Sequence, residues 1–352
     1  MRIMKKVTLA DVAKKAEVSK TTVSNFINKK YDNMSEATKK KIRKVIKELN
    51  YVPSIGAQGM YRKTPNKIIC LIIPRNKDYI LDNVFFKYAI KGITDFTNKT
   101  DFRTMIFTTN KRKKSDIDYV KGLNKGLVDG FILFQVESND MYIKELNEDK
   151  IPFMAVGKYT SEEGKYVDIN NIKGIEAATE HLINHGHQRI ALFNVLSSLI
   201  VNEQNFKGYQ RAHEKHNLKI DKKLIKEGAV DFNTGYRQMN ELLKLKKKPT
   251  AVISDVDRIP GIVKVLNEKK LQVPRDVAIL GITGHDNPYK YDFELSYIKY
   301  PAFEIGYEVT KNLTRMIYSK KEKKNYAKIL NAELILRESC GCVEKKSEIL
   351  AS

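Results

Sequence analysis

Residues 7–53 read VTLADVAKKAEVSKTTVSNFINKKYDNMSEATKKKIRKVIKELNYVP, and this stretch predicts the structure of the N-terminal part of the chain. Thr8, Ser19 and Ser35 each stand where a helix N-cap is expected, because a hydroxyl there can accept a hydrogen bond from a backbone amide of the first turn. Each is followed by apolar residues at helical spacing, which predicts three short amphipathic helices. The third helix ends before Pro53, since the residue before a proline avoids the helical region.

The second of these helices, over residues 19–28, has two different faces. The face predicted to be buried carries Thr22, Val23, Phe26 and Ile27. The face predicted to be exposed carries Lys20, Thr21, Ser24, Asn25 and Asn28. That face is rich in short hydrogen-bonding side chains, whereas a merely solvated helix more often carries Glu/Lys pairs four residues apart. The layout predicts a helix-turn-helix that reads DNA; the alternative is a small helical cap on another domain.

Positive charge is concentrated in the same part of the chain. The whole sequence carries 64 basic and 42 acidic residues, a net charge of +22, and residues 1–67 hold 17 Lys/Arg against 5 Asp/Glu. This fifth of the chain therefore carries more than half of the excess charge. Neutralising phosphates with such a segment releases counterions, which supports a nucleic-acid partner and predicts salt-dependent binding.

Length and composition bound the remainder of the protein. The 352 residues and the apolar content of 42% allow sizeable cores beyond the first three helices. The N-terminus has no apolar segment typical of a signal peptide, and no run of about 18 apolar residues suggests a membrane span. The three cysteines, Cys70, Cys340 and Cys342, make no disulfide framework. We therefore expect a reduced, cytoplasmic setting.

From residue 67 onward, apolar strand-like runs alternate with helical stretches. The predicted strands are KIICLIIP (67–74), RTMIFTT (103–109), VDGFILF (128–134), IPFMAVG (151–157), VDI (167–169), RIALFNV (189–195), TAVISD (250–255) and DVAILGI (276–282). The helical patterns lie near residues 83–99, 115–126, 140–148, 172–184, 203–216, 233–246 and 259–269. This alternation predicts an α/β fold with parallel sheets covered on both faces. The number of strands suffices for two sheets, so we expect a two-lobed core with a ligand cleft at the carboxyl ends of the strands.

Several motifs along the chain resemble one family over nearly its full length. They are TLADVAKKAEVSKTTVS (8–24), LNYVP (49–53), VDG (128–130), AATEHLINHGH (177–187), Gly208-Tyr209, KPTAV (248–252), Val273-Pro274 and LRESC (336–340). On these motifs the chain is similar to the lactose-repressor/galactose-repressor (LacI/GalR) family of bacterial transcription regulators. The resemblance implies an all-α helix-turn-helix domain followed by a two-lobed core like that of periplasmic binding proteins.

The expected organisation has four parts. The DNA-binding domain spans residues 1–53 and a hinge spans 54–67. The effector-binding and dimerisation core spans 68–342, with one lobe at about 68–168 and 299–331 and the other at about 169–298 and 332–342. Residues 343–352 form a tail that is too short for sustained coiled-coil heptads, so a homodimer is expected.

In this family the second helix enters the major groove of the operator, and the resemblance assigns roles to its residues. Lys20 and Thr21 are expected at base edges. Asn25 stands where relatives usually have arginine, so it should pair with adenine or a single acceptor and select a half-site unlike the commonest one. Phosphate contacts are expected from Thr8, Ser19, Thr22, Ser24, Asn28 and Tyr31.

After Pro53 the family folds a hinge helix on DNA and wedges a side chain into the minor groove. The wedge position here is Met60, which can still unstack a base step. Gly56 and Gly59 each lower helix propensity by roughly 1 kcal/mol, so we expect the hinge to be disordered away from DNA. The alternative for this segment is a plain linker.

The resemblance also places a small effector between the two lobes. The residues at the corresponding positions are Arg75, Asn83, Phe86, Asn171, Asn205, Asp255, Thr283 and Lys299. Sugar-responsive relatives have an arginine where this chain has Asn205, so Arg75 or Lys299 is expected to substitute for it. Either the ligand differs from a simple hexose or the site has moved toward a protein partner. The alternative is that Asn205 and Asp255 only satisfy helix starts.

The sequence contains features that resemble a metal site or an enzyme active site, but we expect neither. His181, His185 and His187 could form a metal cluster, but Gly186 should end their helix and direct His187 elsewhere. The Cys340-Gly341-Cys342 spacing is too close for an ordinary metal knuckle, so neither a metal nor another cofactor is expected. No nucleophile elbow, Ser-His-Asp arrangement or phosphate loop is present in the sequence, so we do not expect an enzyme.

Three functions remain open. The first is a DNA-binding repressor of carbohydrate-utilisation genes that is controlled by a sugar-like effector and binds a near-palindromic operator as a homodimer. The second is a regulator whose core responds to a corepressor protein. The third is a sugar-binding transport protein with the same two-lobed core, which residues 7–53 argue against.

Overall fold

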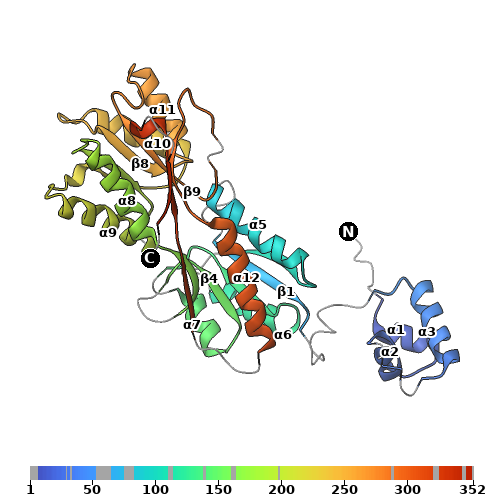
Figure 1. The fold of residues 1–352 in the computed structure, drawn as a ribbon. Coiled ribbons are helices and arrows are strands. Elements are labelled where there is room, and N and C mark those ends of the chain that lie inside the picture. The colour runs from blue at the N-terminus through green and yellow to red at the C-terminus, as the bar shows by residue number, and fades with distance from the viewer. Residues whose placement is uncertain are drawn as a thin grey trace. The chain divides into compact units, whose positions relative to one another are not determined.

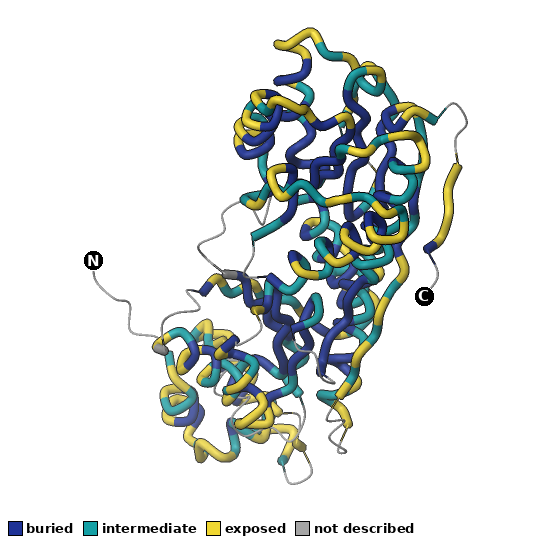
Figure 2. The backbone as a smooth tube through the Cα atoms, turned by 90° about the vertical axis from the view of Figure 1, so that its left-hand side faces the viewer, coloured by how far each residue is buried: buried dark blue, intermediate teal, exposed yellow. Residues whose placement is uncertain are grey.

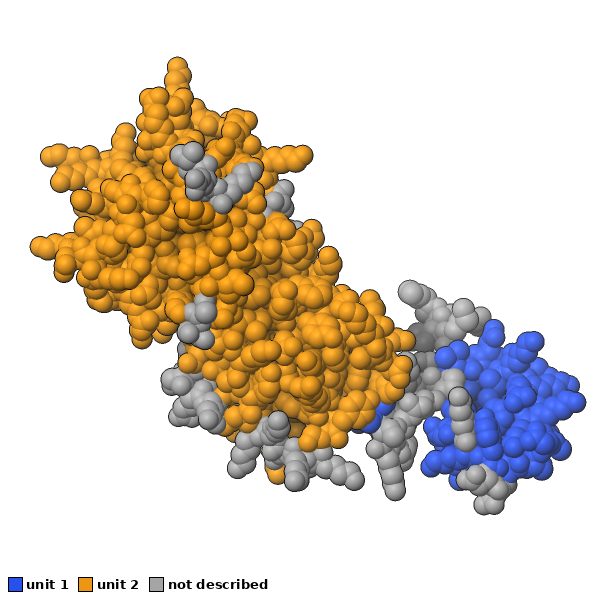
Figure 3. All heavy atoms as spheres, viewed as in Figure 1, with its two compact units in different colours: residues 1–66, 125–127 blue, residues 67–124, 128–352 orange. Residues whose placement is uncertain are grey.

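The computed structural model describes residues 7–28, 30–31, 34–52, 65–74, 83–109, 114–137, 140–159, 164–196, 199–286, 289–319, 325–342 and 346–350. The chain divides into two compact units (Figure 3). The first is a small N-terminal helical unit, and the second is the core that contains both sheets.

The N-terminal unit contains the three helices that the sequence predicts. They are α1 (Leu9–Ala16), α2 (Lys20–Ile27) and α3 (Glu36–Glu48). Thr8, Ser19 and Ser35 cap them, because each hydroxyl accepts a hydrogen bond from the backbone amide three residues further on. The small core that holds the three helices together consists of Val12, Ala13, Ala16, Val23, Ile42 and Val45.

The first lobe of the core is built on a six-stranded sheet in which all pairs of neighbouring strands are parallel. Its spatial order is β11 (Tyr326–Leu330), β5 (Lys165–Ile169), β4 (Phe153–Val156), β3 (Gly130–Leu133), β1 (Ile68–Pro74) and β2 (Arg103–Thr109). The helices of this lobe are α5 (Val84–Asn98), α6 (Lys114–Gly126), α7 (Met141–Glu148) and α12 (Ala302–Tyr318). The prediction of parallel βα units is confirmed for this lobe.

The second lobe has a seven-stranded sheet (Figure 1). Its order is β13 (Lys346–Ile349), β12 (Glu333–Leu336), β10 (Ser296–Lys299), β9 (Ala278–Thr283), β8 (Ala251–Asp255), β6 (Ile190–Asn194) and β7 (Ile225–Glu227). Its helices are α8 (Asn171–Asn184), α9 (Ile200–Lys215), α10 (Phe232–Leu243) and α11 (Ile259–Glu268), with short 3-10 turns at Lys222–Leu224 and Glu338–Cys340. The strands β10, β12 and β13 pair antiparallel, whereas the other pairs are parallel.

The C-terminal segment differs from the expectation of a separate tail. Residues 346–349 form β13, which pairs with β12, and Leu350 is buried in the main hydrophobic cluster. Because β12 otherwise offers an open edge, the backbone groups of the tail complete the sheet on that side.

The helices α5 and α12 lie side by side in the first lobe at unusually close range. A Cβ atom at Gly306 would lie 1.9 Å from the carbonyl oxygen of Ala89, and one at Gly92 would lie 2.0 Å from that of Phe303. Only glycine permits this approach, which brings the backbones of α5 and α12 into direct contact.

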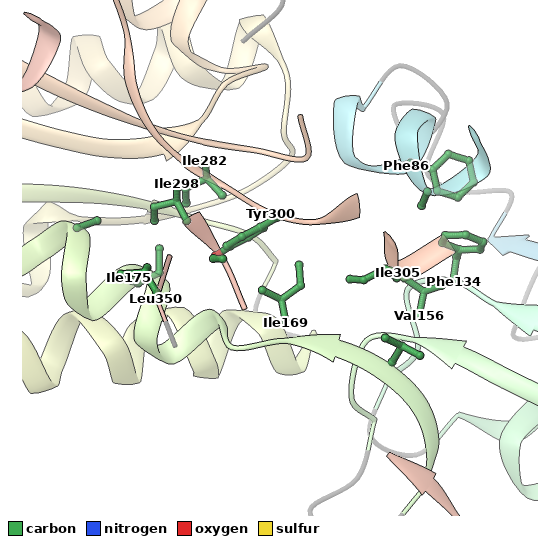
Figure 4. Packing of buried hydrophobic residues seen from close by; sticks show 14 of the residues in the cluster. Phe86, Phe134, Val156, Ile169, Ile175, Ile282, Ile298, Tyr300, Ile305 and Leu350 are labelled. Atoms are coloured by element: carbon green, nitrogen blue, oxygen red, sulfur yellow. The ribbon is translucent and has the colours of Figure 1, made fainter. Parts of the chain in front are cut away.

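Among the described strands the chain crosses between the sheets three times, after β5, after β10 and after β11. One hydrophobic cluster continues across these crossings from Phe86 and Phe134 through Tyr300 to Ile282 and Leu350 (Figure 4). Buried residues run along the strands of both sheets, and exposed residues gather on the outer sides of the helices (Figure 2). The two lobes therefore share one hydrophobic core in the region where the chain crosses between them.

Candidate functional site

The outward face of α2 is the first candidate site. Lys20, Thr21 and Asn25 are exposed, and their side chains make no hydrogen bond or ion pair with any described residue. Val23 is buried, and Phe26 packs against the core of the unit. The division of the helix into a packed and a polar face is as predicted, and the polar face is left available for a partner.

The side chains expected to contact phosphate are already engaged within the unit. The Thr8 hydroxyl donates to Asp11 Oδ2 at 2.7 Å, and the hydroxyls of Ser19 and Thr22 share a hydrogen bond at 2.8 Å. Asn28 Nδ2 donates to the backbone oxygen of Ser24 at 2.9 Å. These bonds hold the helix ends in shape, and a role in phosphate binding stays a prediction for all five residues.

Tyr31 is 36% exposed and lies against the second and third helices. The centroid of the Tyr31 ring is 5.9 Å from that of the Phe26 ring, and Lys39 Nζ lies 4.9 Å from the centroid of the Tyr31 ring. Its position is compatible with the predicted phosphate contact. Met60 and residues 54–64 of the predicted hinge lie outside the described residues.

The second candidate site is a cavity between the two lobes of the core, with a volume of about 210 Å³. It is lined at the carboxyl ends of β3, β4 and β5 in the first sheet and of β6, β7, β8 and β9 in the second. This is the place where open α/β sheets bind ligands. The sequence predicted a ligand cleft at the carboxyl ends of the strands, and the cavity lies there.

One wall of the cavity carries a chain of hydrogen bonds. Asn171 Nδ2 donates to Gln204 Oε1 at 2.7 Å, and Gln204 Nε2 donates to Asp168 Oδ2 at 3.1 Å. Burial raises the pKa of the Asp168 carboxyl, although the bond from Gln204 acts in the opposite direction. The hydrogen bond from Gln204 therefore compensates the charged form of Asp168 only in part.

A second carboxylate, that of Asp257, connects the two lobes at the N-terminal end of α5. Asp257 Oδ2, which follows β8, accepts hydrogen bonds from Asn83 Nδ2 at 3.2 Å and from the Val84 amide at 3.3 Å. Its other oxygen accepts a bond from the Tyr289 hydroxyl at 3.0 Å. Because Asn83 caps α5, Asp257 lies at the positive end of that helix, where a negative charge is favoured.

A buried arginine organises the strand ends beneath the cavity. The side chain of Arg258 is fully buried and donates to the carbonyl oxygens of Phe193, Asn194, Gly228 and Ala229 at 2.7–2.9 Å. Its Nη1 also lies 3.4 Å from Asp255 Oδ2. Burial raises the pKa of Asp255, and Arg258 opposes that shift. Asp255 therefore lines the cavity with the guanidinium group of Arg258 behind it.

The opposite wall of the cavity is aromatic and apolar. Phe86 and Phe134 meet edge to face with ring centroids 4.6 Å apart, and Phe85 and Val156 continue the surface. Tyr300 lines the cavity between the lobes, and its buried hydroxyl has no hydrogen-bond partner among the described residues (Figure 4). Burial, together with the nearby carboxyls of Asp255 and Asp168, raises the pKa of this hydroxyl.

The structure places most of the predicted effector residues at the cavity. Those that line it are Asn83, Phe86, Asn171, Asp255 and Thr283. Asn205 does not: its Nδ2 donates to Asn194 Oδ1 at 3.0 Å in the packing between α9 and β6. Lys299 does not either, because its ammonium is paired with Asp286 at 2.9 Å outside the cavity. Arg75 lies outside the described residues.

Sequence reasoning missed several lining residues that carry charge or a hydrogen-bonding group. They are Lys158, Asp168, Gln204, Asp257 and Tyr300. Lys158 follows directly after a predicted strand, and Asp168 and Asp257 lie within two residues of the end of one, a position that favours a ligand site. Gln204 and Tyr300 had no comparable signal.

Comparisons with known proteins agree on the class of molecule. Residues 8–54 match the family model of bacterial regulatory proteins of the lacI family, and residues 179–340 match that of a periplasmic binding protein-like domain. The transcriptional regulator MalR of Streptococcus pneumoniae is 31% identical over 272 residues, which cover 76% of this chain and 82% of MalR. The chain belongs to the LacI family of bacterial regulatory proteins. It is a DNA-binding transcriptional regulator.

Further relatives extend the match along the whole regulator. The transcriptional repressor PurR of Actinobacillus pleuropneumoniae is 29% identical over 342 residues, covering 96% of this chain and 99% of PurR. The solved structure of the transcriptional regulator CelR in complex with cellobiose is 26% identical, with a TM-score of 0.71 over 95% of this chain and 100% of that one. A lac repressor dimer bound to operator and the anti-inducer ONPF has the same fold, with a TM-score of 0.76 at 21% identity over 96% and 99% of the two chains.

Two broader points follow for this family member. Its relatives are transcription regulators, which are not enzymes. None of the helices in the described ranges combines the length and the apolar character that crossing a lipid bilayer requires.

Proposed function

We propose that this regulator is a cytoplasmic repressor of carbohydrate-utilisation genes. In this proposal it binds a near-palindromic operator as a homodimer, and a neutral sugar held between the core lobes changes its affinity for that operator. The single observation that carries the sugar assignment is the set of polar groups that faces the cavity. Three carboxylates, Asp168, Asp255 and Asp257, line a space with an aromatic wall, together with the Tyr300 hydroxyl, which has no partner within the described part of the chain.

The charge of the cavity favours a neutral ligand over an anionic one. Among its described lining residues, Lys158 is the one cation beside those three carboxylates. A phosphate or a second carboxylate would meet this negative surplus at close range, which disfavours sugar phosphates and sugar acids. Hydroxyl groups, by contrast, can donate to carboxylates and accept from Tyr300.

Shape and relatives support the same class of ligand. The aromatic side chains of Phe85 and Phe134 in the lining suit the apolar C–H surface of a pyranose ring, and the polar groups that also line the cavity suit its hydroxyls. The volume of about 210 Å³ lies below the roughly 300–1,000 Å³ of sites for drug-sized molecules, which favours a small sugar. The CelR structure was solved with cellobiose bound.

A thermal-shift screen tests the ligand assignment. The purified full chain is heated with neutral mono- and disaccharides and, in parallel, with the corresponding sugar phosphates and sugar acids. We expect the melting temperature Tm to rise with at least one neutral sugar and not with its phosphorylated or carboxylated forms. A rise confined to the anionic compounds would contradict the assignment.

The DNA-binding assignment is tested separately by selecting duplexes from a random library with the full chain. We expect a near-palindromic site, two half-sites one helical turn or a multiple of it apart, and a dimer in sedimentation analysis. Recovery of a single half-site by a monomer would contradict the homodimer. Adding the sugar found in the screen should change the affinity for the selected site.

A further inference from the structure

Four side chains that can bind a soft metal ion meet in the second lobe, away from the cavity. His181 and His185 lie one turn apart at the C-terminal end of α8. Cys340 and Cys342 lie in the turn that follows β12. Cys340 and Cys342 are more than 150 positions distant from the histidines in sequence, so only the fold brings the two pairs together.

The potential ligand atoms are close to one another. His181 Nε2 is 3.2 Å from Cys340 Sγ and 3.4 Å from Cys342 Sγ. The two Sγ atoms are 3.4 Å apart, and His185 Nε2 is 3.7 Å from Cys342 Sγ. The ligand atoms of His181, His185 and Cys342 all lie within 4.8 Å of one another.

These distances fit a tetrahedral metal centre. Zn–S bonds of about 2.3 Å and Zn–N bonds of about 2.0–2.1 Å place the ligand atoms of a tetrahedron roughly 3.3–3.8 Å apart. Four of the six separations among these atoms, 3.2–3.7 Å, fall in or beside that interval. The three atoms that all lie within 4.8 Å of one another belong to His181, His185 and Cys342, so a full tetrahedron requires a small movement of Cys340 and His185 toward each other. We propose that His181, His185, Cys340 and Cys342 bind one zinc ion and that this ion fastens the end of α8 to the C-terminal segment.

The surroundings of the four side chains orient them for this role. His185 Nδ1 lies 2.8 Å from the carbonyl oxygen of His181, so the N–H is at Nδ1 and the lone pair is at Nε2, facing Cys342. Ligating histidines commonly donate their other ring N–H to a carbonyl oxygen in this way. On the sulfur side, Ser296 Oγ lies 3.1 Å from Cys340 Sγ and 3.0 Å from the Arg337 carbonyl oxygen, so its one proton can turn to the sulfur when Cys340 is a thiolate.

The ligand types select the metal and the role. Two sulfurs and two imidazole nitrogens favour zinc over magnesium or calcium, which take oxygen ligands. A set of four protein ligands leaves no open coordination position, as in structural rather than catalytic zinc sites. Each thiol loses its proton to solvent when the ion binds, and no oxidation is involved. The ion would stabilise the turn that follows β12 and its contact with α8.

This inference reverses the expectation of no metal that the sequence suggested. The reason is that the HLINHGH and CGC motifs were each judged alone. His187 is indeed directed elsewhere, since its Nδ1 lies 3.0 Å from Thr250 Oγ1, and Gly186 has the positive φ of +88° expected where the helix ends. The HLINHGH motif supplies the two histidines and the CGC motif supplies the two cysteines. Each motif alone therefore provides only two of the four ligands of a tetrahedral site.

Cobalt spectroscopy tests the site. The untagged full chain, kept reduced with a phosphine and stripped with a chelator, is titrated with Co²⁺. We expect one equivalent to bind with a thiolate-to-cobalt charge-transfer absorption and the visible bands of tetrahedral cobalt, both removed by Zn²⁺. Zinc should also raise the Tm of the stripped protein by several degrees, because it binds only the folded site.

Two ligand variants and one matched control decide whether the named residues are responsible. Cys342→Ser and His185→Gln should weaken Co²⁺ binding by more than the 10–100-fold typical of losing a supporting group. His187→Gln changes a histidine of the same segment outside the cluster and should bind cobalt as the parent does. His185 is exposed, so its replacement leaves the metal-free fold intact, which circular dichroism verifies.

Three results would overturn the proposal. The first is the absence of charge-transfer absorption in the reduced parent protein. The second is unchanged absorption in Cys342→Ser. The third is a Cys340–Cys342 disulfide that persists in the reduced sample, since that bond would use up both sulfur ligands.

Discussion

The carboxylate of Asp257 should set how tightly the start of α5 is held against the second lobe. We choose Asp257→Asn because it keeps the shape of the side chain and one acceptor oxygen but removes the charge. Both bonds from the first lobe, Asn83 Nδ2 at 3.2 Å and the Val84 amide at 3.3 Å, end on the same oxygen of Asp257. The change therefore acts directly on a contact between the lobes.

The expected size of the effect follows from these bonds. Hydrogen bonds to charged groups contribute about 1.5–3 kcal/mol, and bonds longer than about 2.9 Å belong at or below the low end. A further 0.3–1 kcal/mol or so comes from the charge at the helix N-terminus. Because asparagine keeps one acceptor, we expect a loss of about 1–2 kcal/mol, or roughly a 5–30-fold shift of the local opening equilibrium.

Amide hydrogen exchange of the ligand-free protein measures this shift directly. Protection of the amides at the start of α5, from Val84 to Phe86, should fall by roughly the same 5–30-fold factor. Tyr289→Phe is the matched control, because it removes a hydrogen bond to the same carboxylate from within the second lobe. Unchanged protection in Asp257→Asn, or an equal loss in Tyr289→Phe, would refute the reasoning.

Four further predictions concern the DNA-reading face and the cavity. Asn25→Arg should change the preferred base at one half-site position in a selection experiment while the salt dependence stays that of the parent; Lys20→Ala should cost about 1–3 kcal/mol at the preferred site and less at mismatched ones. Tyr300→Phe should lower sugar affinity by roughly 2–12-fold, the effect of one hydrogen bond, while Tm in the absence of sugar is unchanged or higher, because an unpartnered buried hydroxyl is removed. Burial raises the pKa of Asp168 from an ordinary value near 3.8, so its contribution to stability is present below that pH and is lost as the pH rises through the folded pKa. Asp168→Asn should therefore flatten this part of the Tm–pH curve, and a steeper curve in the variant would contradict the sign.

The central strands and the helices were predictable because each carries a local pattern. Strands such as β8 and β9 are covered on both faces and read as unbroken apolar runs, and the caps of α1, α2 and α3 stand directly before their apolar stripes. The strands that the sequence did not reveal lie mostly at or near sheet edges. β7, β11 and β13 are largely half-buried or exposed, so their residues need no continuous apolar run.

The polar part of the cavity was harder to predict than its location. Strand ends mark where a ligand site should lie, but the sequence does not say which polar side chain turns inward. Asn205 lies one position after Gln204 on α9, and it is Gln204 that faces the cavity and reaches Asp168. A shift of one residue rotates a helical side chain by about 100°, so alignment to a motif can select the wrong neighbour.

The cavity residues and the contact between the lobes are energetically linked. Asp168 and Asp255 have raised pKa values because burial disfavours their charge, and the Tyr300 hydroxyl has no hydrogen-bond partner among the described residues. Asp168, Asp255 and Tyr300 line the cavity between the lobes, so the part of their burial that comes from the facing lobe works against the closed arrangement that Asp257 supports. A bound polyol that donates to the carboxylates and accepts from Tyr300 would remove the penalties in that arrangement and not in an open one. Its binding would therefore shift the lobes toward closure by its differential affinity, which is the requirement for a ligand to act on a distant DNA-binding unit.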